Sequence, residues 1–396
     1  MKQAKPVRVL DKGAAFKFVV LLGVVSLFGD MTYEGARSIT GPYLSLLGAS
    51  AAVVGLVAGF GELIGFGLRL FSGYISDKTG RYWTITIAGY VVNLLAVPAL
   101  ALAGSWQFAA LLMILERTGK AIRAPSRDAL LSYATKQTGH GKGFGLHEAL
   151  DQIGALTGPL IVALVMWYRA GNGKEDYATA FAFLLIPALL AIGLVLIARF
   201  LYPRLTDLDA ALPTPDPTGW KRTFWLYLGG VGLVAAGYAD FPLLAYHFEK
   251  ADVLSGNIIP LVYSLAMGVD AVAALLFGRL FDKSGIQALV ISTLLSAGFA
   301  PLAFTGSPVL VIAGAVLWGV GMGAQESIMR AAVAKLVPIE RRGTAFGVFN
   351  TGYGLCWFAG SALMGFMYDI SIPLLVTFSV AVQLVAIFFF VVASKD

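Results

Sequence analysis

The sequence predicts an all-α integral membrane protein, in which twelve transmembrane helices form two pseudo-symmetric six-helix bundles. Hydrophobic residues make up 58% of the 396 residues and charged residues only 13%, whereas a soluble domain carries about a quarter charged residues. Apolar runs of about 20 residues, the length that crosses a bilayer, recur along the whole chain. The two halves of the chain also share short motifs at corresponding places.

Twelve apolar runs can be located in order. They cover approximately 16–39, 51–75, 83–103, 107–134, 143–168 and 179–201, then 223–247, 256–281, 286–304, 309–336, 343–367 and 371–393. The stretch from Pro203 to Lys221 holds several prolines and acids, so it cannot continue a helix or enter lipid. We therefore expect an N-terminal six-helix bundle over 1–202, a cytoplasmic linker over 203–221 and a C-terminal six-helix bundle over 222–396.

The loop charges orient these helices. If the amino terminus is cytoplasmic, the outer loops hold only Arg169, Lys174 and Lys250, and the other loop lysines and arginines lie inside, among them Lys78 and Lys283. Loops rich in lysine and arginine stay on the cytoplasmic side of a membrane. We therefore expect a multi-pass protein of the cell (inner) membrane with both termini in the cytoplasm.

The net charge of +6 does not indicate nucleic-acid binding, because the positive residues are dispersed over short loops and form no continuous patch. The single cysteine, Cys356, excludes a disulfide and a cysteine-based metal site. The sequence contains no Gly-x-x-x-x-Gly-Lys-Ser/Thr loop for ATP. We expect no cofactor. The expected partners are a small-molecule or ion substrate, protons and the lipid bilayer, and the expected state is a monomer.

The chain contains an internal repeat. The second apolar run ends in GYISDKTGR from Gly73, and the eighth ends in GRLFDKSG from Gly278, so both place Asp four residues after Gly and Lys directly after Asp. Arg127 in the fourth run has a counterpart in Arg330 in the tenth. A duplicated six-helix unit is typical of transporters with a central binding site.

These loops resemble a family motif. The first, with Gly73, Asp77, Lys78, Gly80 and Arg81, is similar to the hallmark of the major facilitator superfamily, and the copy around Asp282 matches it except for Ile286. GALTGP, from Gly154 to Pro159, is similar to the Gly-Pro motif of the superfamily's antiporters. Three stretches, from Gly29, Glu116 and Phe144, resemble a bacterial efflux-permease branch that includes nickel-resistance-type exporters, although the histidine-rich tail of some such exporters is missing.

The resemblance implies export in exchange for protons by alternating access, with the first, fourth, seventh and tenth helices around a central cavity. It also implies a latch of contacts at the cytoplasmic side, which break when the cytoplasmic side of the protein opens. The latch residues are then Gly73, Asp77, Lys78, Gly80, Arg81, Arg127, Asp128, Glu148 and Asp282, and the antiporter-type motif is Gly154, Gly158 and Pro159. The alternative for Asp77, Arg127, Asp128 and Glu148 is mutual neutralisation that holds helices in register.

Charges inside the apolar runs are the candidate site residues, because each costs a few kcal/mol in lipid unless it is paired or hydrated. In the first run Asp30, Glu34 and Arg37 are spaced by four and three, hence on one helix face. A carboxylate withdrawn from water binds a proton more readily. We expect Asp30, Glu34 and Asp240 to carry the coupling proton, with Glu62 and Glu326 as further candidates. Arg37, Arg123 and Arg330 either bind an anionic group of the substrate or stabilise these carboxylates.

The predicted function is therefore that of a secondary active transporter of a small solute, by proton-coupled export. A divalent metal exporter is an alternative, although His147 and Asp151 are its only weak ligand candidates, and two ligands on one helix do not complete a site. An alternative of another class is an intramembrane lipid-modifying enzyme that uses the same pair for acid-base work. We predict no enzymatic activity. A duplicated arrangement of twelve helices is what two bundles that move against each other require, whereas a catalyst does not require it.

Overall fold

The computed structural model describes residues 11–138, 140–169, 173–203, 222–337 and 342–394. Regular structure within these ranges is entirely helical, so the predicted all-α class is confirmed. The first half contains α1 (Lys12–Leu46), α2 (Ala51–Thr79), α3 (Tyr82–Ala99), η1 (Leu100–Leu102), α4 (Trp106–Thr138), α5 (His140–Arg169), α6 (Lys174–Phe183) and α7 (Leu185–Leu201). The second half contains α8 (Arg222–Gly237), α9 (Phe241–Lys250), α10 (Ile259–Ser284), α11 (Gln287–Ser296), α12 (Phe299–Ala303), α13 (Pro308–Ala324), the π-helical turn η2 (Gln325–Met329), α14 (Arg330–Leu336), α15 (Arg342–Ile370) and α16 (Ile372–Ala393).

Each of the twelve predicted apolar runs coincides with one or more of these helices. Among the described residues, nine helical segments are long and apolar enough to cross a membrane. The other three runs correspond to α4, to α11 with α12, and to α15. The middle of α4 carries Glu116, Arg117, Lys120 and Arg123, and α11 with α12 forms only a short apolar segment.

The outer surface of the helices is apolar. Phe200 is 84% exposed, Leu102 80% and Trp167 71%. Large apolar side chains on so much of a surface favour lipid over water as the surrounding medium. Together with the nine apolar segments, this surface defines a multi-pass integral membrane protein.

Four runs are not the single helices that the sequence predicted. The run 179–201 divides into α6 and α7 after Phe183, because Pro187 has no N–H to donate to the carbonyl of residue 183. The run 223–247 divides before Asp240, which caps α9 with Pro242 in its first turn. The run 286–304 divides at Gly298, and the run 309–336 contains the π-helical turn η2.

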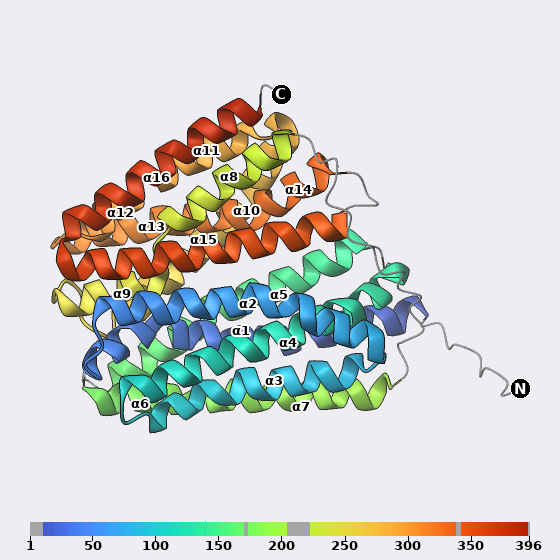
Figure 1. Ribbon diagram of the computed structural model, residues 1–396. Coiled ribbons are helices and arrows are strands. Elements are labelled where there is room, and N and C mark those ends of the chain that lie inside the picture. Colours follow the sequence, from blue (N-terminus) through green and yellow to red (C-terminus); the bar gives the residue numbers. More distant parts are fainter. Residues whose placement is uncertain (1–10, 139, 170–172, 204–221, 338–341, 395–396) are drawn as a thin grey trace, which may run out of the picture.

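The two halves of the chain occupy different parts of the molecule. Figure 1 shows the blue-to-green helices of the first half below and the yellow-to-red helices of the second half above. Helix α1 begins and α16 ends at the same end of the molecule, here called the terminal face, and the other end is the opposite face. The halves pack through α1 against α9, α2 against α15 and α5 against α10.

Glycines allow the halves to meet near the opposite face. A Cβ atom on Gly41 of α1 would lie 1.9 Å from the carbonyl oxygen of Pro242 in α9. On Gly55 of α2 it would lie 2.2 Å from the carbonyl oxygen of Ser361 in α15. Both distances are too short for any side chain, so backbone touches backbone here, as small residues permit in membrane helix pairs.

A carboxylate adds hydrogen bonds between the two halves at the opposite face. Asp369, near the end of α15, accepts hydrogen bonds from the backbone N–H groups of Ala51 at 3.2 Å and Ala52 at 2.9 Å. These N–H groups open α2, where the helix dipole favours an anion. The hydroxyl of Tyr246 in α9 donates to the carbonyl oxygen of Ala49 at 3.3 Å. The halves are thus fastened together at the opposite face.

Candidate functional site

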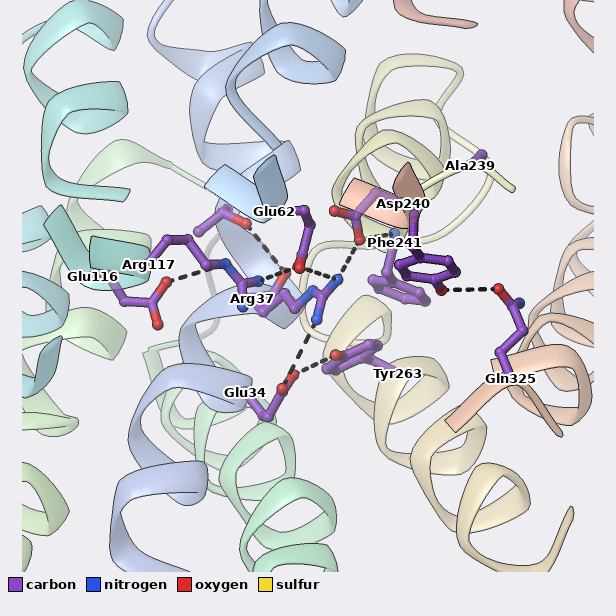
Figure 2. Close-up of polar contacts among 12 residues, drawn as sticks. Glu34, Arg37, Glu62, Glu116, Arg117, Ala239, Asp240, Phe241, Tyr263 and Gln325 are labelled. Atoms are coloured by element: carbon purple, nitrogen blue, oxygen red, sulfur yellow. Dashed lines mark hydrogen bonds and ion pairs between the residues drawn. The ribbon is translucent and has the colours of Figure 1, made fainter. Parts of the chain in front are cut away.

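Arg37 lies at the centre of a buried charge network. Its guanidinium contacts Glu34 one turn earlier in α1 at 3.9 Å and Glu62 of α2 at 3.4 Å. It also donates to Asp240, at the start of α9. Figure 2 shows the three carboxylates around this guanidinium. The sequence singled out all four residues, and the structure brings them together.

A second guanidinium extends the network into α4. Arg117 contacts Glu62 at 3.2 Å and Glu116 at 3.3 Å, so Glu62 bridges two arginines. Asn93 of α3 donates to Glu116 at 2.8 Å. No side chain of the network is more than 14% exposed. We call the six residues the central charge cluster, comprising Glu34, Arg37, Glu62, Glu116, Arg117 and Asp240.

The cluster joins the two halves of the chain. Asp240 is the N-cap of α9, and its carboxylate also accepts from the backbone N–H of Phe241 at 2.9 Å. The hydroxyl of Tyr263 in α10 donates to Glu34 (Figure 2). The break between α8 and α9 therefore places a carboxylate opposite Arg37, and the junction of the halves becomes a polar contact in the middle of the protein.

Asp30 lies apart from this cluster. It is 8% exposed, and its electrostatic neighbours are Lys120 and Arg123 of α4 with Asp151 of α5. Lys120 lies 3.9 Å from the centroid of the Tyr33 ring. Within the described residues no ion pair joins Asp30 to Arg37. The structure thus brings Glu34 and Asp240 together through Arg37 and places Asp30 in a second polar group.

Arg123 belongs to that second group. It is 1% exposed, and its guanidinium lies 4.3 Å from the centroid of the Tyr90 ring. Its Nε and Nη1 atoms make no hydrogen bond within the described part of the chain. Arg330, the predicted counterpart of Arg127 in the second half, lies outside the residues whose side chains the structure describes.

Two small cavities flank the central charge cluster. One, of about 40 Å³, is lined by Arg37, Arg117 and Asp240 among others. The other, of about 70 Å³, lies between the halves and includes the candidates Glu62 and Glu326. Its remaining walls are largely apolar or aromatic and comprise Phe66, Met322, Gln325, Met329, Phe349, Tyr353 and Trp357. Glu326 is exposed, whereas the side chains of the cluster carboxylates are at most 14% exposed.

The loop of the predicted latch has a local structural role. Gly80 adopts φ +64° and ends α2 in the left-handed conformation that favours glycine. The hydroxyl of Tyr82 donates to Asp77 at 2.9 Å. Gly73 packs against Pro125 of α4, since a Cβ atom there would lie 3.5 Å from the proline ring. Lys78 and Arg81 are exposed.

Among the described residues, no hydrogen bond or ion pair joins the other latch candidates to this loop. Arg127 contacts Asp128 at 2.8 Å and Asp151 at 3.9 Å. Glu148 and Asp282 are exposed. In this conformation Arg127 is therefore paired within its own half, away from Asp77.

The antiporter-type motif fastens α5 to α1. Cβ atoms on Gly154 and Gly158 would lie 2.2 Å and 2.3 Å from the carbonyl oxygens of Leu27 and Met31. Pro159 follows inside α5 without ending it. The motif thus sets the position of the helix that carries Asp30, Glu34 and Arg37.

His147 and Asp151 do contact each other, at 3.3 Å. The other ring nitrogen of His147 lies 3.3 Å from the Ser26 hydroxyl, which also accepts from Arg127 at 3.0 Å. Across the described ranges no group of three histidine, cysteine or acidic side chains is placed to hold a metal ion.

Three residues that contribute to the site were absent from the sequence-based candidates, namely Glu116, Arg117 and Tyr263. Arg117 directly follows Glu116 in the sequence and lies off the helix face that Glu116, Lys120 and Arg123 share. Its charge inside an apolar run was nevertheless a sufficient signal to include it. Tyr263 carried no such signal, because tyrosines in membrane helices mostly serve packing or the interface.

The fold and the buried charges at the junction of its halves define a membrane transporter of the twelve-helix type. The sequence profile of the Major Facilitator Superfamily matches residues 21–361, and the chain belongs to this superfamily. The family assignment indicates a transporter rather than an enzyme.

Similar sequences occur in distant organisms. An uncharacterized protein of Mycobacterium tuberculosis is 43% identical over 380 residues, which cover 94% of this chain and 92% of the relative. An uncharacterized MFS-type transporter of Methanocaldococcus jannaschii is 28% identical over 377 residues, or 90% and 89% of the two chains.

Solved transporters share the fold. A peptide transporter in complex with sulfate gives a TM-score of 0.73 at 14% identity, covering 95% of this chain and 93% of that one. A nucleoside transporter gives 0.70 at 15% identity, with 96% and 97% covered. A bacterial homologue of the iron transporter ferroportin gives 0.68 at 17%, with 96% and 99% covered. At these identities the likeness shows the fold alone.

Proposed function

We propose that the protein is a secondary active transporter that exports a small solute in exchange for protons, by alternating access to a site between its halves. The central charge cluster carries this proposal. Arg37 and Glu34 of one half contact Asp240 and Tyr263 of the other. Alternating access requires such contacts to break when the opposite face opens. A ligand that neutralises a cluster carboxylate therefore shifts the equilibrium between the state that is closed at the opposite face and the state that is open there.

The charges of the cluster support a cationic ligand. Four carboxyl groups are linked there by ion pairs to two guanidinium groups, and Lys120 and Arg69 act electrostatically on Glu62 from nearby. A carboxylate that loses its guanidinium partner when the halves separate can bind a proton or a cationic group of the substrate in its place. Protons and a cationic substrate would then compete for the same group of acids, and their exchange follows from electrostatics.

The direction of transport rests on the resemblance of Gly154, Gly158 and Pro159 to the antiporter motif and of the chain to the efflux-permease branch. A divalent metal remains the alternative substrate. A stability screen of the purified protein against Ni²⁺, Zn²⁺ and organic cations separates the two classes, because a ligand of the folded state raises apparent stability by mass action. We also infer a monomer whose six-helix bundles, 1–202 and 222–396, move relative to each other about the linker 203–221.

We infer that the terminal face is cytoplasmic and that the protein lies in the cell membrane. In a Cys356→Ala background, cysteines replacing Lys78 and Lys283 should react with an impermeant maleimide only after the membrane is permeabilised. A cysteine replacing Lys250 should react in intact cells, because this exposed residue ends α9 at the opposite face. The reverse pattern would invert the topology.

Coupling is tested in proteoliposomes with the substrate that the screen identifies. Asp30→Asn mimics a permanently protonated carboxyl group, so it should abolish transport driven by a pH gradient and remove the pH dependence of substrate binding. Asp252→Asn is the matched control, since Asp252 is exposed and its φ of +51° suits asparagine equally. Gradient-driven transport at the wild-type rate by Asp30→Asn would exclude Asp30 as a coupling group.

A further inference from the structure

Asp270 of α10 is a buried carboxyl group that the central charge cluster does not include. It is 2% exposed, and its Oδ1 atom has no hydrogen-bond partner within the described residues. Among the side chains that the structure describes, no basic nitrogen lies within the 4.0 Å of an ion pair. Burying an ionised carboxylate without a partner is costly, so such a group is stable mainly in its neutral, protonated form.

The groups around Asp270 reinforce this state. Among the side chains that the structure describes, the titratable and charged groups that act on it are Glu326 of η2, Glu34 and Arg37 of α1, Glu148 of α5 and Tyr238 before α9. Three of these five are acids. Arg37 is the only cation among them, and it is engaged by the carboxylates of the central charge cluster.

The backbone next to Asp270 is unusual. A Cβ atom on Gly323 of α13 would lie 2.7 Å from the Asp270 Oδ1 atom, so only glycine lets the carboxyl group rest on this helix. The π-helical turn η2 starts two residues later. Such turns interrupt the regular helical ladder and occur frequently at functional sites.

Glu326 connects Asp270 to water. It lies within the π-helical turn, is exposed, and lines the cavity of about 70 Å³ between the halves. Its carboxylate acts electrostatically on Asp270. Glu326 is thus open to the cavity, whereas Asp270 is buried against α13.

We propose that Asp270 is a second proton-binding site of the transporter, loaded from the cavity through Glu326. A proton from cavity water binds the Glu326 carboxylate and passes to the Asp270 carboxylate, leaving Glu326 ionised again. No other bond changes. The site rests on the proposed proton coupling for its role in transport, but its occupancy by a proton is a separate, measurable property.

Infrared difference spectroscopy of the purified protein measures that property without a substrate. Wild type and Asp252→Asn should show the carbonyl stretch of protonated carboxylic acids at neutral pH, and Asp270→Asn should lose the component that belongs to Asp270, while any component from Asp30 stays. Asp270→Glu should restore a band at a shifted frequency. Glu326→Gln should retain the Asp270 band at equilibrium and slow its response to a pH jump, because the relay has been removed.

The outcomes separate this inference from the proposed function. An unchanged carboxylic acid band in folded Asp270→Asn, with a wild-type unfolding temperature, would overturn the site. A lost band together with pH-independent transport by the wild-type protein would keep the site and overturn proton coupling. An equally fast pH-jump response in Glu326→Gln would overturn the route through Glu326.

Discussion

Arg37→Met should destabilise the protein severely, whereas Asp240→Asn should leave it folded. Removing the guanidinium leaves Glu34, Glu62 and Asp240 buried around a neutral side chain, and breaking a buried ion pair in this way costs about 3–5 kcal/mol. Removing the charge of Asp240 leaves Arg37 with two carboxylates. Asparagine also keeps the N-cap of α9, since asparagine and aspartate cap helices almost equally well.

Thermal unfolding in detergent gives the comparison. The loss of unfolding temperature should be several times larger for Arg37→Met than for Asp240→Asn. Arg117→Met is the matched control within one half, because its partners Glu62 and Glu116 both belong to that half. It should lower stability without changing access at the opposite face, while Asp240→Asn should increase that access. Equal losses from Arg37→Met and Asp240→Asn would show that Arg37 has no role beyond its contact with Asp240.

Gly41→Ala should open the opposite face without unfolding either half. The added methyl group would lie 1.9 Å from the carbonyl oxygen of Pro242, a contact that only separation of α1 from α9 relieves. An overpacking cost of about 1–3 kcal/mol, acting only on the state in which the halves meet, shifts the equilibrium between the states about 5- to 150-fold. Transport should fall correspondingly, because the cycle must pass through the disfavoured state.

Labelling from outside measures this shift. Val57 lines the cavity of about 40 Å³ beside the central charge cluster, so Val57→Cys in a Cys356→Ala background should react faster with an impermeant maleimide when Gly41→Ala is added. Gly193→Ala, where the new methyl group meets nothing within 4 Å, should change neither labelling nor stability. Gly119→Ala would press 2.2 Å from the Asn93 backbone between α4 and α3. It should lower the unfolding temperature and leave labelling unchanged.

If Gly41→Ala also lowered the unfolding temperature as much as Gly119→Ala, without faster labelling, the contact between α1 and α9 would be part of a rigid core. The halves would then have to separate at a contact other than the one between α1 and α9. The two alanine variants therefore distinguish a contact that alternates during the cycle from one that holds a single half together.

The sequence by itself determined the fold class and the position of all twelve apolar runs, because lipid requires about 20 apolar residues for each span and internal hydrogen bonds for each backbone. It also identified Glu34, Arg37, Glu62 and Asp240, because a charged side chain in an apolar run costs free energy unless it is paired or hydrated. These are local properties, set by each segment and its solvent.

Tertiary structure alone decided which of these charges meet. Helical spacing places Asp30, Glu34 and Arg37 on one side of α1, but it does not fix the rotation of α1 against its neighbours. Packing of Gly154 and Gly158 against α1, and of Gly41 against Pro242, sets that rotation. As a result Arg37 reaches Asp240, while Asp30 faces α4 and α5. The placement of Asp270 against Gly323, residues from two separate helices, likewise depends on contacts that no single segment encodes.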